Sequence, residues 1–292
     1  MKARTFVLAS ALILAAGCGD NKPYIDVQAH RGGAGLMPEN TITAMRNAID
    51  LKVNTLEFDL QLSSDGQVVV SHDNYFHPRY ATRPDGTLIQ ADDPKEYLYT
   101  MPYDSIAKYD VGMRPSEVWP GQANIADIKP LASDLIDFAE GYAKKPVNYN
   151  IEIKSWPGDG EGTLWPDYVT FCDTCIPLLL SKNLGDRLIV QCFDTRALEY
   201  MHEKWPELIL SYLTDEDEPD IEEILSNLSF TPRWWSPHYS VVTAENVARC
   251  HELGIGVVPW TVDDPLEMMR LVQCGVDAII SNYPDLLIQI VR

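Results

Sequence analysis

The chain has 292 residues, of which 46% are hydrophobic and 23% charged. This composition excludes an intrinsically disordered protein and provides ample material for a hydrophobic core. The formal net charge of −20 argues against nucleic acid as a partner, because phosphate backbones are bound by basic surfaces. An acidic protein can still bind one phosphate where a metal ion or local cations reverse the field.

The N-terminus is typical of an export signal. A basic start precedes an apolar run at 6–16, which is too short to cross a bilayer, since a spanning helix needs about 20 residues. Small residues directly before Cys18 resemble a bacterial lipobox, in which the cysteine is lipidated. We expect 1–17 to be a lipoprotein signal peptide and the protein to be exported and lipid-anchored to a bacterial membrane (periplasmic or surface-facing). An ordinary secretory signal with an incidental cysteine is the alternative.

Short apolar runs rich in β-forming residues alternate with amphipathic helical patterns, which predicts parallel βαβ units. The expected parallel strands are 24–30, 54–60, 147–154, 188–193, 208–213, 233–239, 256–262 and 277–281. The expected helices are 39–51, 132–144, 167–183, 195–204, 220–228, 243–253 and 265–274. Eight parallel strands make a closed (β/α)₈ barrel. We therefore predict an α/β fold, a single TIM-barrel domain over 18–292.

One strand-like run, Val68–His72, breaks this alternation. It follows the second strand too closely for a parallel crossover, which takes a dozen or more residues. The turn signal Asp65-Gly66 indicates a hairpin, so we interpret 57–72 as a strand extended into a hairpin with an antiparallel return arm. The next segment, 77–129, is rich in Pro, Tyr, Asp and Gly and too long for a plain loop. We expect this insertion of about 50 residues to cap one face of the barrel.

Two further features receive no catalytic role. Cys172 and Cys175 form an isolated CxxC pair, which is weak evidence for zinc. A local disulfide or two half-buried thiols are the alternatives. The acidic stretch 215–223 is interpreted as a solvated loop leading into a helix, where the dipole favours acidic residues.

Charged and polar side chains cluster near the predicted carboxyl ends of the strands, where barrel active sites lie. Glu57 and Asp59 are two residues apart on one strand and so face the same side. The return arm of the hairpin brings His72 back beside them. The charged set that should converge at one mouth is His30, Arg31, Glu57, Asp59, His72, Glu152 and Lys154. Later strand ends add Gln191, Phe193, Trp260 and Asp263.

Three carboxylates in this set, Glu57, Asp59 and Glu152, would repel one another strongly unless a cation neutralised them. Oxygen ligands suit Mg²⁺ or Ca²⁺ better than Zn²⁺. We therefore predict that these residues hold one divalent cation, Ca²⁺ or Mg²⁺. Each residue alone also has a structural explanation, such as a salt bridge or a core position. The joint pattern carries the prediction, because every charged group falls near the same end of the barrel.

Six blocks carry a family resemblance: HRGGAGLMPENT, EFDLQLSSDGQVVVSHD, NIEIK, VQCFD, VPWTVDD and GVDAIISNYPD. In this order, over about 27–285, they resemble the signatures of the glycerophosphodiester phosphodiesterase family. The resemblance implies a (β/α)₈ barrel with a small insertion after the HD block. It also implies a divalent metal, Ca²⁺ or Mg²⁺, at positions 57, 59 and 152. Two blocks depart mildly from the family: its WTVN reads WTVD here, and its ITDYP reads ISNYP.

The resemblance implies hydrolysis of a glycerophosphodiester to sn-glycerol 3-phosphate and an alcohol. The catalytic histidines of the family fall on His30 and His72, and its phosphate-contacting arginine on Arg31. Lys154 matches a lysine near the metal and phosphate. One histidine removes a proton from the attacking hydroxyl and the other protonates the departing alcohol. By family analogy we favour His30 as base and His72 as acid.

Phe193 and Trp260 are candidate substrate contacts. Together with Tyr99, Tyr103, Trp119 and Trp156 they could cage a choline-like head group, or they could simply pack. No protein partner is implied.

Three rivals remain. One is a phospholipase of the phosphoinositide or sphingomyelinase D type on the same barrel. Another is a surface lipoprotein that binds glycerophosphodiesters without cleaving them. The last is a glycosidase using two carboxylates, which leaves the histidine pair and Arg31 unexplained.

Overall fold

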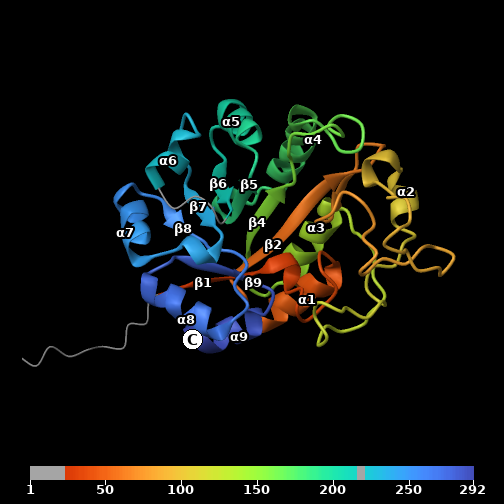
Figure 1. Ribbon diagram of the computed structural model, residues 1–292, viewed down its shortest axis with the longest axis horizontal. Coiled ribbons are helices and arrows are strands. Elements are labelled where there is room, and N and C mark those ends of the chain that lie inside the picture. Colours follow the sequence, from red (N-terminus) through yellow and green to blue (C-terminus); the bar gives the residue numbers. More distant parts are fainter. Residues whose placement is uncertain (1–23, 216–220) are drawn as a thin grey trace, which may run out of the picture.

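Nine strands form one sheet in the residues that the computed structural model describes, 24–215 and 221–292 (Figure 1). They are β1 (Asp26–Ala29), β2 (Thr55–Leu62), β3 (Val68–Val70), β4 (Asn148–Ile153), β5 (Leu188–Cys192), β6 (Ile209–Thr214), β7 (Trp234–Pro237), β8 (Gly256–Val257) and β9 (Ala278–Ser281). The parallel strands follow one another in the spatial order β8-β7-β6-β5-β4-β2-β1-β9. β3 stands apart from this order and pairs antiparallel with β2.

Hydrogen bonds between the two ends of this order close the sheet into a barrel. The N–H of Asp277 donates to the carbonyl of Val257 at 3.1 Å, and the N–H of Ile280 donates to that of Pro259 at 3.0 Å. The β8 segment is thereby joined to the β9 segment, and no edge remains between them. The prediction of an α/β barrel with eight parallel strands is confirmed.

Helices surround the barrel on its outside (Figure 1). They are α1 (Ile42–Leu51), α2 (Tyr103–Ile106), α3 (Ala132–Tyr142), α4 (Tyr168–Ser181), α5 (Thr195–Lys204), α6 (Ile221–Ser226), α7 (Ala244–Glu252), α8 (Pro265–Cys274) and α9 (Pro284–Val291). Two differences from the sequence-based prediction matter. α1 begins at Ile42 instead of residue 39, because Thr41 caps it by accepting a hydrogen bond from the N–H of Ala44 at 3.1 Å. α9, which has proline in its first turn, was not predicted.

The alternation of side chains along β2 separates the hydrophobic core from the polar interior. Leu56, Phe58 and Leu60 are fully buried in the main hydrophobic cluster with residues of the helices. Glu57 and Asp59 point to the opposite side of the strand, into the barrel. Packing of the apolar set against the helices thus fixes the direction of the two carboxylates.

The hairpin is present, and its register places Leu60 opposite Val70. The segment 77–129 follows it and contains α2 and the 3₁₀ turn η2 (Leu98–Thr100). Its Ile89, Leu98 and Ile106 form a small hydrophobic core together with Phe76, which directly precedes the segment. In Figure 1 this segment lies at the side of the barrel, near β2 and α3.

Cys172 and Cys175 lie on α4 as fully buried free thiols. Burial raises the pKa of the Cys172 thiol to about 12, so it stays protonated at neutral pH. The CxxC pair is therefore a packing feature of α4. Across the part of the chain that the structure describes, no helix combines the length and the apolar character needed to cross a membrane.

Candidate active site

A tight turn after β1 begins the site. His30–Gly32 forms the 3₁₀ turn η1, in which Arg31 has φ 52° and Gly32 φ 80°. A left-handed conformation is costly for a residue such as arginine and is often found at functional sites. A Cβ on Gly32 would lie 2.7 Å from the Cβ of Ala44, so only glycine fits there. The turn directs the Arg31 N–H to Oε2 of Glu57 at 2.8 Å.

Three buried carboxylates meet inside the barrel mouth. Asp59 on β2 is in register with Glu152 on β4, and Glu57 lies two residues before Asp59 on the same face. One ligand oxygen from each of the three lies within 4.8 Å of the others. We call Glu57, Asp59 and Glu152 the carboxylate cluster. The structure brings together the three residues that the sequence predicts as metal ligands.

Glu57 is held from below by a chain of side-chain amides. Gln191 Nε2 donates to Glu57 Oε1 at 2.9 Å, and Asn150 Nδ2 donates to Gln191 Oε1 at 3.1 Å. The same Asn150 group donates to Gln28 Oε1 at 2.8 Å, and Gln28 Nε2 donates to Asp26 Oδ2 at 3.2 Å. We call this the amide chain. It runs from the amino end of β1 to the mouth.

Asp59 and Glu152 have other partners. Asn40 Nδ2 donates to Asp59 Oδ2 at 2.8 Å, while Oδ1 of Asp59 is buried without a hydrogen-bond partner in the described residues. The Lys154 ammonium lies 2.9 Å from Oε1 of Glu152 and 3.5 Å from Oδ1 of Asp59. Burial opposes the charge on Lys154, but these two carboxylates keep its pKa above the ordinary value.

The carboxylate cluster is electrostatically strained. Burial raises the pKa of Glu152 to about 7. Burial, together with the charge of Asp59, raises the pKa of Glu57 well above its usual value. Burial would raise that of Asp59 as well, but Lys154 and His72 hold its pKa below the ordinary value. A buried, oxygen-only donor set with one carboxylate oxygen that accepts no hydrogen bond from the described residues fits a hard divalent cation.

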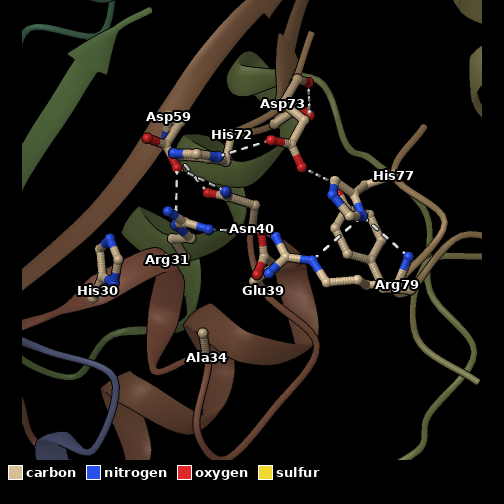
Figure 2. Close-up of polar contacts among 12 residues, drawn as sticks. His30, Arg31, Ala34, Glu39, Asn40, Asp59, His72, Asp73, His77 and Arg79 are labelled. Atoms are coloured by element: carbon tan, nitrogen blue, oxygen red, sulfur yellow. Dashed lines mark hydrogen bonds and ion pairs between the residues drawn. The ribbon is translucent and has the colours of Figure 1, made fainter. Parts of the chain in front are cut away.

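Arg31 links the cluster to the start of the covering helix. Its Nη1 lies 3.0 Å from Oε1 of Glu39, and its Nε lies 3.5 Å from Oδ2 of Asp59. Figure 2 shows the guanidinium between these two carboxylates. The Arg31 side chain is 13% exposed, so part of it faces the mouth and can meet a substrate anion.

His72 has a carboxylate directly behind it (Figure 2). Its Nδ1 lies 3.1 Å from Oδ1 of Asp73, and the Tyr80 hydroxyl donates to Oδ2 of Asp73 at 3.2 Å. The buried Lys129 ammonium in turn donates to the Tyr80 oxygen at 3.2 Å. Burial lowers the pKa of Lys129 to about 8. His72 is thus supported by residues from both ends of the insertion.

His30 has an amide behind it. Its Nδ1 lies 2.7 Å from Oδ1 of Asn282, which directly follows β9. Burial and the adjacent positive charge of Arg31 lower the pKa of His30 well below its usual value. The ring is therefore neutral at neutral pH and can accept a proton.

Two adjoining cavities open at the mouth, with volumes of about 230 Å³ and about 400 Å³. The smaller one is lined by nine of the residues predicted at the mouth: His30, Arg31, Glu57, His72, Glu152, Lys154, Gln191, Phe193 and Trp260. Asp59 lies just beneath, 1% exposed. Phe193 and Trp260 meet edge to face with ring centroids 5.4 Å apart. The larger cavity shares Phe193 and adds Trp156.

The insertion and two of the candidate aromatic residues lie away from the two cavities. None of the residues 77–129 lines either cavity, so the insertion packs beside the mouth and does not cover these hollows. Tyr103 donates its hydroxyl to the carbonyl of Lys129, and Trp119 lines a separate small hollow. Asp215, in the acidic stretch that received no role, lines both cavities.

Sequence reasoning also gave no role to several polar residues that support the site. Asn40 lies in the quoted PENT motif, and Asn282 is one of the two departures from the family blocks. The signal was present in both motifs. What the sequence lacks is the partner of each amide.

A model of the glycerophosphoryl diester phosphodiesterase family matches residues 30–286. The chain belongs to this family. The match covers the HRGG turn, both histidines, the carboxylate cluster and Asn282.

Several members of the glycerophosphoryl diester phosphodiesterase family are similar over most of their length. A glycerophosphodiester phosphodiesterase of Caldanaerobacter subterraneus is 28% identical over 91% of this chain and 97% of its own. Lysophospholipase D of Mus musculus is 31% identical over 88% of this chain and 82% of its own.

Solved structures share the barrel. A Silicibacter pomeroyi protein assigned to the glycerophosphoryl diester phosphodiesterases matches with a TM-score of 0.83 and 26% identity over 92% of this chain and 93% of its own. An Oleispira antarctica phosphodiesterase, solved with its product sn-glycerol-3-phosphate, matches with a TM-score of 0.72 over 92% and 96%. At 23% identity, the second likeness shows the fold alone.

Asp26, at the end of the amide chain, makes the free energy of unfolding depend on pH. Burial raises the pKa of Asp26 to about 6, from 3.8. Protonated Asp26 therefore makes its full contribution to the free energy of unfolding below the pKa that Asp26 has in the unfolded chain. This contribution is lost as the pH rises through about 6. Asp26→Asn removes this loss. Between about pH 4 and pH 7, the free energy of unfolding of the variant should rise by about 2 kcal/mol relative to the wild type. Urea unfolding at both pH values measures this, and parallel pH dependences would contradict it.

Proposed function

We propose that this protein hydrolyses glycerophosphodiesters to sn-glycerol 3-phosphate and an alcohol. One observation carries the proposal: a single cavity unites two histidines, two cationic side chains and a cluster of buried carboxylates. Membership of the glycerophosphoryl diester phosphodiesterase family and the named activity of the Caldanaerobacter relative support it.

A divalent cation, Ca²⁺ or Mg²⁺, is the proposed cofactor, held by the carboxylate cluster. Arg31 and Lys154 lie against the cluster, and Glu39 pairs with Arg31. With all these groups ionised, four carboxylates face two cations and leave two negative charges uncompensated. When bound, a divalent cation supplies positive charge that stabilises a phosphoryl oxygen. The chain's own contribution is to hold the oxygen ligands in a buried, fixed arrangement.

Arg31 and Lys154 bind the phosphate. Both side chains line the small cavity with their cationic nitrogens already fixed by carboxylates. Positive charge fixed in this way stabilises the negative charge that develops on the phosphorane, without reorganisation during the reaction. A substrate phosphate would therefore lie between these two side chains, against the carboxylate cluster.

The two histidines move the protons. His30 takes the proton of the attacking hydroxyl, from glycerol or water, as the new P–O bond forms. His72 gives a proton to the alcohol oxygen as the old P–O bond breaks. Nδ1 of His72 faces Asp73, so its Nε2 carries the proton that is donated. Burial and the charges of Arg31 and Lys154 lower the pKa of His72 below its ordinary value, and the carboxylate of Asp73 opposes this by favouring the protonated ring.

A lysophospholipid is a second candidate substrate, because the mouse relative is a lysophospholipase D. Such a lipid contains the same glycerol phosphodiester with an acyl chain added. The larger cavity, with Trp156 and Phe193 in its wall, offers apolar surface next to the phosphate position. Assaying glycerophosphocholine, glycerophosphoethanolamine and lysophosphatidylcholine side by side separates the two classes.

We also propose that the protein is anchored to a bacterial membrane through a lipid on Cys18. The support is the sequence alone: an apolar run followed by small residues and a cysteine. Residues 1–23, including Cys18, lie outside the described residues. Such an anchor would keep the enzyme beside the membrane that supplies lipid-derived diesters.

Removal of either histidine should abolish most turnover. His30→Ala and His72→Ala should each lower kcat at least about 100-fold, since each removes one proton-transfer group. Release of sn-glycerol 3-phosphate from glycerophosphocholine measures this, with circular dichroism to verify folding. His251→Ala is the matched control, because His251 is 43% exposed and pairs with Asp277 away from the cavity. Near-wild-type turnover in both variants would exclude this mechanism.

Metal removal gives a separate prediction. EDTA should abolish turnover, and Ca²⁺ or Mg²⁺ should restore it and raise the melting temperature of the wild type. Asp59→Asn should weaken metal affinity at least about tenfold, because it removes one ligand charge from the cluster. Isothermal titration with each ion measures the affinity without substrate. Equal metal affinities for wild type and variant would contradict the assignment of Asp59.

The anchor is tested by fractionation of cells that express the full chain. The wild type should partition into the detergent phase. The Cys18→Ala variant should be recovered in the aqueous phase, because it carries no lipid. Recovery of the wild type from the aqueous phase would contradict the lipoprotein prediction. Cys274→Ala is the control, since Cys274 lies within the folded barrel.

A further inference from the structure

The amide behind His30 is itself held by a carboxylate. Asn282 is 6% exposed and directly follows β9. Its Nδ2 donates to Oδ2 of Asp263 at 2.8 Å, and its backbone N–H donates to Oδ1 at 2.9 Å. Two hydrogen bonds to one carboxylate fix both the position and the rotation of the Asn282 amide.

This arrangement determines which nitrogen of His30 carries the proton. Carboxylate oxygens only accept hydrogen bonds, so the NH₂ group of Asn282 must face Asp263 and its oxygen must face His30. That oxygen also only accepts, so Nδ1 of His30 must be the donor over the 2.7 Å contact. In a neutral imidazole the other nitrogen, Nε2, then has no proton. His30 lines the small cavity, and its Nε2 has no hydrogen-bond partner among the described residues.

We propose that Asn282 and Asp263 are positioning residues that hold His30 in its Nδ1–H tautomer, so that Nε2 accepts the proton of the attacking hydroxyl. The inference rests on the proposed function and deepens it. Neither residue touches the reacting atoms. Their effect passes through the ring of His30.

The residues behind the two histidines differ in charge. Asp73, a carboxylate, lies against His72 at 3.1 Å and stabilises its charged form. Asn282, a neutral amide, orients His30 without adding charge next to it. The pKa of both rings is lowered by burial, that of His30 further than that of His72, so His72 is the ring that holds a proton more readily.

The two positioning residues coincide with the two departures from the family blocks. Where the family reads WTVN and ITDYP, this chain has Asp263 and Asn282. One amide and one carboxylate are kept, but their places are exchanged. In this chain the amide of Asn282 contacts His30, and the carboxylate of Asp263 contacts Asn282. The other charged groups that act on His30 are Arg31, Asp59 and His72, and the exchange leaves them unchanged.

The tautomer is measured directly by ¹⁵N NMR of histidine-labelled protein, with His30 assigned by its loss in His30→Ala. In the wild type, Nδ1 should be protonated and Nε2 should not. In Asn282→Leu the ring should populate both tautomers, because the acceptor is gone. A wild-type His30 protonated on Nε2 would overturn the proposal, as would identical spectra for the two proteins. This readout needs no turnover, so it stands apart from failure of the proposed function.

The pH profile of kcat/KM, with saturating metal, tests the consequence for the reaction. The exchange variant Asp263→Asn/Asn282→Asp places a carboxylate against His30 and should move the acidic limb up by about one pH unit. Asn282→Leu should lower kcat at least about tenfold with KM within about twofold. Asn54→Asp, at the other end of the barrel, should leave the profile unchanged. A profile of the exchange variant that superimposes on the wild type would overturn the proposal, and Asn282→Leu decides it if the exchange variant does not fold.

Discussion

Burial of three carboxylates within 4.8 Å of one another is the constraint on which the rest of the site depends. Each charge taken out of water is costly unless it is paired or hydrogen-bonded. Part of this cost is offset by the backbone N–H of Arg31 and the ammonium of Lys154. The side-chain amides of Asn40 and Gln191 offset a further part. The mouth is therefore a set of groups arranged around excess negative charge, and that charge is what a cation would satisfy.

The insertion acts on the site from behind. Tyr80 and Lys129 lie near its two ends, 49 positions apart in sequence; Tyr80 donates to Asp73 behind His72, and Lys129 donates to Tyr80. Their hydrogen bonds fix Asp73, and Asp73 fixes the imidazole. In the proposed mechanism the insertion therefore supports the proton donor without lining the cavities. Changes within its small core should act on His72 through Asp73.

Much of the fold and of the site could be predicted from sequence, because both follow short-range patterns. Strand and helix alternation defines the barrel, and a spacing of two residues places Glu57 and Asp59 on one face. The pairing of Asn282 with His30 could not be predicted, because the two residues are 252 positions apart and only closure of the barrel brings them together. The place of the insertion was also hidden, since its composition shows that it is irregular but not which surface it packs against.

The amide chain has a consequence for how substitutions in this barrel are understood. In barrels of this type, residues at the amino ends of the strands usually affect stability, and those at the carboxyl ends affect chemistry. Here an unbroken series of side-chain hydrogen bonds joins Asp26 at one end to Glu57 at the other. The amino end of this barrel is therefore linked to its carboxyl end by side-chain hydrogen bonds. Substitution of a single amide in the amide chain can displace the carboxylate oxygen of Glu57 at the mouth.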